Sequence, residues 1–100
     1  MQIIWSIKNV KSKSKIDDLQ NVVTHVYWDC KIIDEENELS DFRYGVVAVE
    51  LDKSKPFIAF EDLTDEIYLQ WVFQSAMSKH DVEDELTKSI NAKKQFLKEA

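Results

Sequence analysis

The sequence predicts an α+β fold: an antiparallel sheet of three or more strands, with two antiparallel C-terminal helices packed on one face. Two observations predict it. Before Lys55 the chain alternates at period two, and after it apolar residues recur at i, i+3, i+4 and i+7. The change falls within Lys55–Met77, where Pro56 lacks a backbone N–H and therefore ends the preceding strand. The length of 100 residues predicts a single domain over residues 1–100.

Three extended segments precede the change, over about residues 2–10, 19–33 and 42–53. In the first, Ile3, Trp5 and Ile7 share one side of the strand. The second and third carry apolar residues at both odd and even positions, so both of their faces need cover. Gly45, the sole glycine, is predicted to mark a bulge or a close approach of the backbone.

Two helices follow, over about residues 65–77 and 81–97. Thr64 suits the N-cap of the first helix, and Trp71 is predicted to anchor that helix in the core. Ser78 or His80 can cap the second, whose acidic N-terminal turn and basic C-terminal turn match the helix dipole. Because the connection between the helices is short, we expect them to pack as antiparallel neighbours.

Two charged segments lie among the strands. Lys11–Lys15, the only basic cluster, is interpreted as a solvated loop, with a phosphate contact as the alternative. The acidic residues over 34–41 are interpreted as a solvated hairpin loop, with a cation site as the alternative, because they lack the glycine and ligand spacing of a calcium loop. The net charge of −6 argues against nucleic-acid and anionic-membrane binding. We expect no signal peptide and no membrane span.

Catalytic signatures are missing from the sequence. It contains no nucleophile elbow, phosphate loop, dinucleotide fingerprint or His-Glu-x-x-His motif. Cys30 and His25 lie five residues apart on one predicted strand, hence on opposite faces, and cannot form a dyad there. Cys30 is interpreted as a small core residue, and a contact with His80 across the fold is the alternative. We therefore expect no enzymatic activity, no cofactor and no metal ion.

Several segments are similar to a known family. They are a Trp near the start, the Val-Tyr-Trp of residues 26–28, Pro56-Phe57 and, above all, the segment from Phe60 to Val72. Together they resemble small tailed-phage proteins of about this length, which form a family with a domain of unknown function. The resemblance implies a phage origin and a virion or assembly role. That family has no assigned catalytic residues to transfer to this chain.

The number of helices leaves one side of the predicted sheet without cover. Two helices shield one side, whereas the second and third strands are apolar on both, so a row of apolar residues is expected to pack on another chain. The predicted partner interface is Val23, Tyr27, Tyr44 and Val46.

The leading functional hypothesis is therefore a non-enzymatic virion structural or assembly protein, such as a small tail, neck or capsid accessory subunit. It is expected to be made in the host cytoplasm and to be an oligomer or part of a larger assembly. Its partners are other virion proteins or copies of itself. The alternative is an acidic phage-encoded inhibitor whose carboxylates bind a host nucleic-acid-interacting protein.

Overall fold

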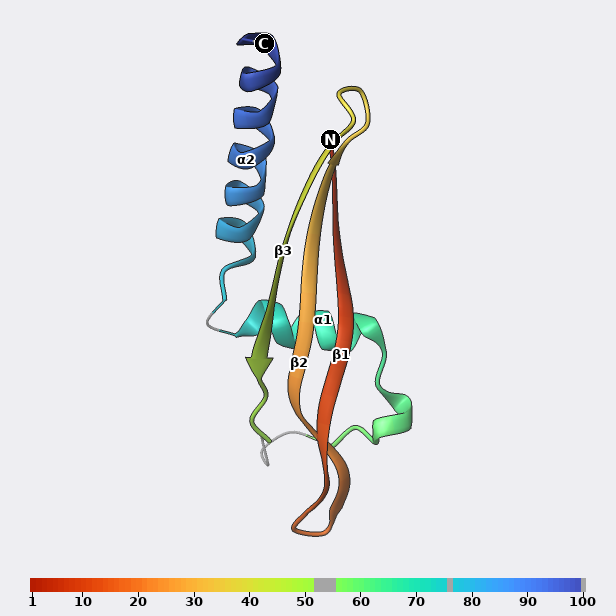
Figure 1. The fold of residues 1–100 in the computed structure, drawn as a ribbon. Helices are drawn as coiled ribbons and strands as arrows, with labels where there is room; N and C mark the ends of the chain where they lie inside the picture. The colour runs from red at the N-terminus through yellow and green to blue at the C-terminus, as the bar shows by residue number, and fades with distance from the viewer. Residues whose placement is uncertain (52–55, 76, 100) are drawn as a thin grey trace.

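The protein forms a three-stranded antiparallel sheet followed by two helices (Figure 1). The computed structural model describes residues 1–51, 56–75 and 77–99. The sheet has the order β1–β2–β3, and the predicted α+β fold class is confirmed. Residues 52 and 53 of the predicted third strand and residue 76 of the predicted first helix lie outside the described residues. The elements are β1 (Gln2–Ile16), β2 (Leu19–Asp34), β3 (Leu39–Ala48), the 3-10 turn η1 (Phe60–Asp62), α1 (Asp65–Gln74) and α2 (Lys79–Glu99).

The basic segment Lys11–Lys15 is part of β1, so its interpretation as a loop was wrong. It pairs with the start of β2, and β3 ends at Ala48, opposite His25. The ribbon over residues 12–23, which we call the arm, is therefore only two strands wide, and its lysine side chains stay in water while their backbone pairs. The arm contributes to an elongated shape. The radius of gyration is 17.3 Å, against about 13 Å for a compact chain of this length.

Two bulges decide which residues of β1 and β2 face the helices. Ile7 pairs with Trp28 but Asn9 pairs with Tyr27, which leaves Lys8 as an extra residue in β1. Likewise Lys11 pairs with His25 and Ser12 with Val23, which leaves Thr24 extra in β2. An extra residue reverses the parity of every side chain beyond it. Each strand therefore changes, part-way along, which of its alternating positions lie on the helix side.

Both helices cover the same face of the sheet, but they are not antiparallel neighbours as the sequence predicted. The helix α1 crosses behind the strands in Figure 1 and packs on β1 and β2, whereas α2 runs along β3 and packs on β3 and β2. Each helix thus buries its apolar side on its own part of the sheet. The hydroxyl of Thr64 accepts a hydrogen bond from Ile67 N (3.4 Å), which confirms the predicted N-cap. Ser78, whose hydroxyl accepts from Asp81 N (3.2 Å), caps α2 in place of His80.

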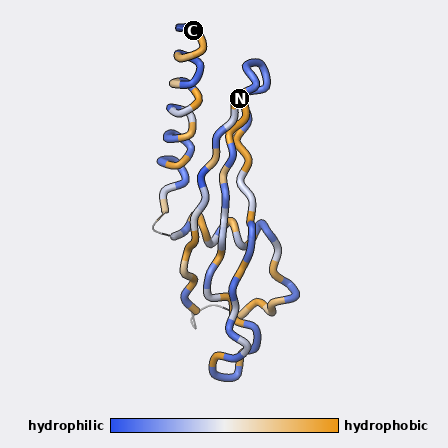
Figure 2. The backbone as a smooth tube through the Cα atoms, in the orientation of Figure 1, coloured by the Kyte–Doolittle hydropathy of each residue, from blue (hydrophilic) through white to orange (hydrophobic). Residues whose placement is uncertain are grey.

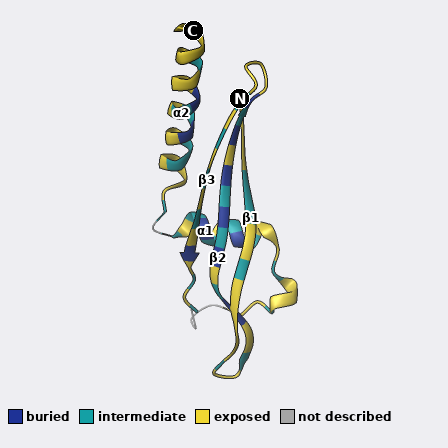
Figure 3. Cartoon of the chain, viewed as in Figure 1, coloured by how far each residue is buried: buried dark blue, intermediate teal, exposed yellow. Residues whose placement is uncertain are grey.

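The core lies between β2 and the helices (Figure 3). Trp71 is only partly buried and is not the anchor of α1, so that prediction was wrong. Tyr68 and Val72, one helical turn apart, are the buried side chains of α1, and Trp71 packs edge-on against the Tyr68 ring (5.6 Å between ring centroids). The buried residues of the core cluster are Val23, Val26, Trp28, Cys30 and Ile32 on β2, Val47 on β3, and Tyr68, Val72, Leu86 and Ile90 on the helices.

The close backbone approach predicted at Gly45 is present. Gly45 is the β3 partner of Trp28, and a Cβ atom at this position would lie 2.8 Å from Cζ2 of the indole ring. Because glycine has no side chain, the Trp28 ring can lie against β3 at this position. On the other side Trp28 contacts Trp5 (5.3 Å between ring centroids), whose Nε1 donates a hydrogen bond to Glu83 Oε2 (2.8 Å) on α2.

Candidate interaction surface

The face of the sheet opposite the helices carries an apolar strip. We call this strip the open face. Phe42, Tyr44 and Val46 alternate along β3, with exposed fractions of 55 %, 78 % and 51 %. The pairing register adds Tyr27 beside Val46, and Ile4 on β1 opposite Lys31, the partner of Phe42. The open face therefore consists of Ile4, Tyr27, Phe42, Tyr44 and Val46.

The structure places three of the four predicted interface residues, Tyr27, Tyr44 and Val46, on the open face. Val23 is not among them, because it is only 6 % exposed and belongs to the core cluster. The bulge at Thr24 turns the Val23 side chain to the helix side, so including Val23 in the interface row was wrong. Sequence reasoning also omitted Phe42, which the period-two pattern had placed on the same side as Tyr44 and Val46.

The open face combines aromatic rings with lysines. The rings of Phe42 and Tyr44 stack with their centroids 6.1 Å apart and their planes 24° apart. Nζ of Lys11 lies 5.7 Å from the centre of the Tyr27 ring, a cation–π contact. Asp29, the partner of Tyr44, lies 3.4 Å from Nζ of Lys8 and accepts a hydrogen bond from Ser6. An apolar strip on β3 is thus flanked by a polar, basic region on β1 and β2.

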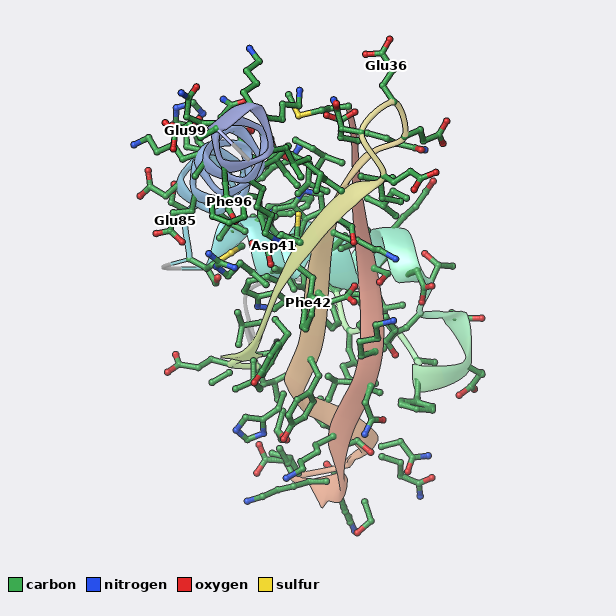
Figure 4. All side chains as sticks on the ribbon, turned by 45° about the horizontal axis from the view of Figure 1, so that its top comes forward. Glu36, Asp41, Phe42, Glu85, Phe96 and Glu99 are labelled. Carbon is green, nitrogen blue, oxygen red and sulfur yellow. The ribbon has the colours of Figure 1, made fainter. Side chains whose placement is uncertain are left out.

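The acidic loop between β2 and β3 is hydrophilic (Figure 2), and an aspartate on each of the two strands that it joins contacts α2. Asp34 is buried, with its Oδ2 2.8 Å from Nζ of Lys94 and 3.0 Å from Nδ2 of Asn37. The hydrogen bonds from Lys94 and then Asn37 lower the pKa of Asp34 from 3.8 to about 2. Asp41 lies between β3 and α2 (Figure 4), and its hydrogen bond from Ser89 is the main cause of its lowered pKa.

The lowered pKa of Asp34 predicts loss of stability in acid. A carboxyl whose pKa is lower in the folded state stabilises that state above its unfolded pKa. This stabilisation is lost as the pH falls from about 3.8 towards about 2. Thermal unfolding midpoints measured over this range should fall steeply in the parent protein and less steeply in Lys94→Met. The matched control is Lys98→Met on the same helix, and an equal flattening in this variant would contradict the assignment to Asp34.

The cysteine and histidines do not form a catalytic group. Cys30 is buried in the core, and this burial is the main cause of a thiol pKa raised to about 11. His25 pairs with Lys11 on the open side of the sheet, and His80 is exposed and lies 3.1 Å from Asp84. Within residues 1–51, 56–75 and 77–99, no cluster of His, Cys, Asp and Glu is arranged to hold a metal ion. No helix in this part of the chain is long and apolar enough to cross a membrane.

A cavity of about 390 Å³ lies between the part of the sheet around Val22 and Ala48 and the chain that leads into α1. Ser75 is the only hydroxyl among its described lining residues, and it donates a hydrogen bond to the Val72 carbonyl (2.6 Å). This hydroxyl is therefore not paired with a general base. Much of the remaining wall is apolar, including Val22, Leu63 and Trp71.

A comparison with protein families identifies the chain. The model described as "Domain of unknown function (DUF7936)" matches residues 1–100. The chain belongs to the DUF7936 family. The DUF7936 domain thus includes the sheet, both helices and the whole open face, and the predicted membership of a family of unknown function is confirmed. No curated protein and no solved structure matches the chain significantly.

Proposed function

We propose that this DUF7936 protein is a non-enzymatic structural or assembly protein of a tailed-phage particle, and that its open face binds another protein. The observation that carries the proposal is the strip formed by Phe42, Tyr44 and Val46, which are all more than half exposed on one strand. Monomeric proteins rarely expose large contiguous apolar patches, and aromatic residues are enriched in the cores of protein interfaces. The strip has the composition of such a core.

The phage assignment rests on the resemblance of Phe60–Val72 to small tailed-phage proteins. Under this assignment the protein is made in the host cytoplasm and becomes part of the virion, as a small tail, neck or capsid accessory subunit. Its partners are then other virion proteins or further copies of the chain. Cys30 is a poor candidate for a nucleophile, because burial disfavours its thiolate and raises its pKa.

A matched pair of substitutions tests the proposal. Phe42→Asp places a charge within the apolar strip of the open face, whereas Phe96→Asp makes the same change at a residue that is 71 % exposed on α2 (Figure 4). Mass spectrometry of purified particles is expected to detect the parent protein and Phe96→Asp in stoichiometric amounts. Phe42→Asp should be depleted at least about tenfold, because a desolvated aspartate in an apolar contact is strongly unfavourable.

Absence of the parent protein from particles would refute the virion assignment. Recovery with a host nucleic-acid-interacting protein in infected cells would instead support the acidic inhibitor. In the structure, several of the carboxylates that such an inhibitor would present already lie next to basic side chains. Asp34 pairs with Lys94, Asp41 and Glu85 both lie near Arg43, and Asp84 pairs with His80.

A further inference from the structure

The open face lies between the arm at one end of the molecule and the acidic loop at the other. The arm carries Lys13 and Lys15 beyond the point where β3 stops, followed by Asp17 and Asp18 at its tip, and the loop between β2 and β3 carries Glu35 and Glu36 at the opposite end (Figures 1 and 4). Counted along the paired residues, Lys13 lies as far from Tyr44 in one direction as Glu35 lies in the other. Lys13 and Glu35 are therefore placed symmetrically about Tyr44.

This symmetry defines how two copies fit together. Two sheets that pack face to face with antiparallel strands are related by a twofold axis perpendicular to the strands. If the axis passes through Tyr44, the two Tyr44 rings meet, and Phe42 of each copy meets Val46 of the other. Lys31, opposite Phe42 in the register, then lies over the Tyr27 ring of the second copy. Aromatic and aliphatic side chains face one another throughout the β3 strip.

The same axis brings unlike charges together at both ends. Lys13 and Lys15 of each copy reach Glu35 and Glu36 of the other, and symmetry produces this contact twice. A twofold axis parallel to the strands would instead place arm on arm and acidic loop on acidic loop. Repulsion between the two acidic loops disfavours that parallel arrangement, since like charges that face each other across an interface oppose association.

The available area suits a dimer. The three-stranded region is ten residues long. At about 3.3 Å per residue and about 4.8 Å per strand, its footprint is roughly 475 Å² per copy. Two copies thus contribute about 950 Å² before the end contacts are counted, close to the roughly 1,000 Å² expected of a specific interface. The thin sheet would become the centre of a two-sheet sandwich with a helix layer on each outer side.

We infer that a second copy of this chain covers the open face, with antiparallel strands and with each arm against the acidic loop of the other copy. The inference rests on the proposed function, because it names the partner of the same surface. The purified protein is then a twofold dimer, and this dimer is the unit that enters the particle.

Charge reversal with rescue tests this arrangement by sedimentation equilibrium. One variant carries Lys13→Glu and Lys15→Glu, and another carries Glu35→Lys and Glu36→Lys. Each alone should dimerise at least about tenfold more weakly than the parent at low salt, because both ends then bring like charges together. An equimolar mixture should recover parental affinity, since every end contact in the mixed dimer again joins a lysine to a glutamate. Native mass spectrometry identifies the mixed dimer by its mass.

Two controls keep the test specific. Lys88→Glu, an exposed residue of α2, should leave the dimer intact, and so should Phe96→Asp, whereas Phe42→Asp should yield a folded monomer by circular dichroism. A parent protein that remains monomeric at high micromolar concentration overturns the inference. So does a mixture of the two charge variants that fails to recover. Salt-dependent binding of an oligo-dT probe by a monomeric parent would assign the surface to single-stranded nucleic acid instead.

Failure of this inference is distinguishable from failure of the proposed function. If the parent protein is a monomer but is present in particles, and Phe42→Asp is lost from them, the proposed function stands and the dimer is refuted. If the protein is a dimer that passes the rescue test but is absent from particles, the dimer stands and the virion assignment is refuted.

Discussion

Leu86→Ala is expected to lower the free energy of unfolding by about 2–5 kcal/mol, because it removes a fully buried side chain and leaves a cavity between α2 and the sheet. A domain of this size is stable by only roughly 5–15 kcal/mol in total, so the variant should lose a large fraction of its stability. Urea unfolding followed by tryptophan fluorescence measures the loss. Because association would add to apparent stability, parent and variant must be compared at one protein concentration.

Leu97→Ala is the matched control on the same helix. Its side chain is half exposed, and surface substitutions of this kind change stability by about 0.5 kcal/mol or less. If the two substitutions had equal effects, α2 would not pack on the sheet through its Leu86 side. The comparison therefore tests the placement of the helix as well as the size of the core.

The α+β class and the start of α1 could be predicted because their signals are local. Period-two alternation and the Thr64 cap each act within a few residues. The prediction that Pro56 ends the third strand was wrong, because β3 already ends at Ala48. Gly45 was predictable for a related reason, since a lone glycine in an apolar strand has few explanations other than a close neighbour. None of these features depends on how distant segments meet.

The parts that sequence reasoning missed depend on pairing between strands. The lysines of the arm have poor strand patterning, yet they form a strand because β2 offers them a hydrogen-bonding partner. The bulge at Thr24 has no marker in the sequence, and it moves Val23 from the expected interface into the core. The packing of α1 on β1 and β2, and of α2 on β3 and β2, is likewise not revealed by the short connection between the helices.

The two faces of the sheet differ in what they do for the molecule. On the helix side, ion pairs and hydrogen bonds such as Lys94–Asp34 and Trp5–Glu83 join elements far apart in the sequence. On the open face, the ion pair between Asp29 and Lys8 stays within neighbouring strands, and the aromatic strip extends along the edge strand β3. The contacts on the helix side stabilise the fold, whereas the apolar side chains of the open face make few such contacts. Their exposure supports a role in binding another protein.

Gly45→Ala is expected to destabilise the protein, although strand propensity alone predicts the opposite. Replacing glycine with alanine at a compatible position stabilises a protein by about 0.4–1 kcal/mol through the unfolded chain. Here the new methyl group would lie 2.8 Å from Cζ2 and 3.0 Å from Cε2 of Trp28, and overpacking a core typically destabilises by about 1–3 kcal/mol. The steric effect is larger, so urea unfolding should show a net loss of about 1–2 kcal/mol.

A double-mutant cycle with Trp28→Phe isolates this contact. The smaller ring lacks the fused part of the indole that approaches Gly45, so Gly45→Ala should lose most of its destabilising effect in that background. An equal loss in both backgrounds would show that the effect does not arise from Trp28. A gain in stability in the parent would mean that the Trp28 ring can move away from β3. In that case the single glycine of the chain would not be what gives the indole its place in the core.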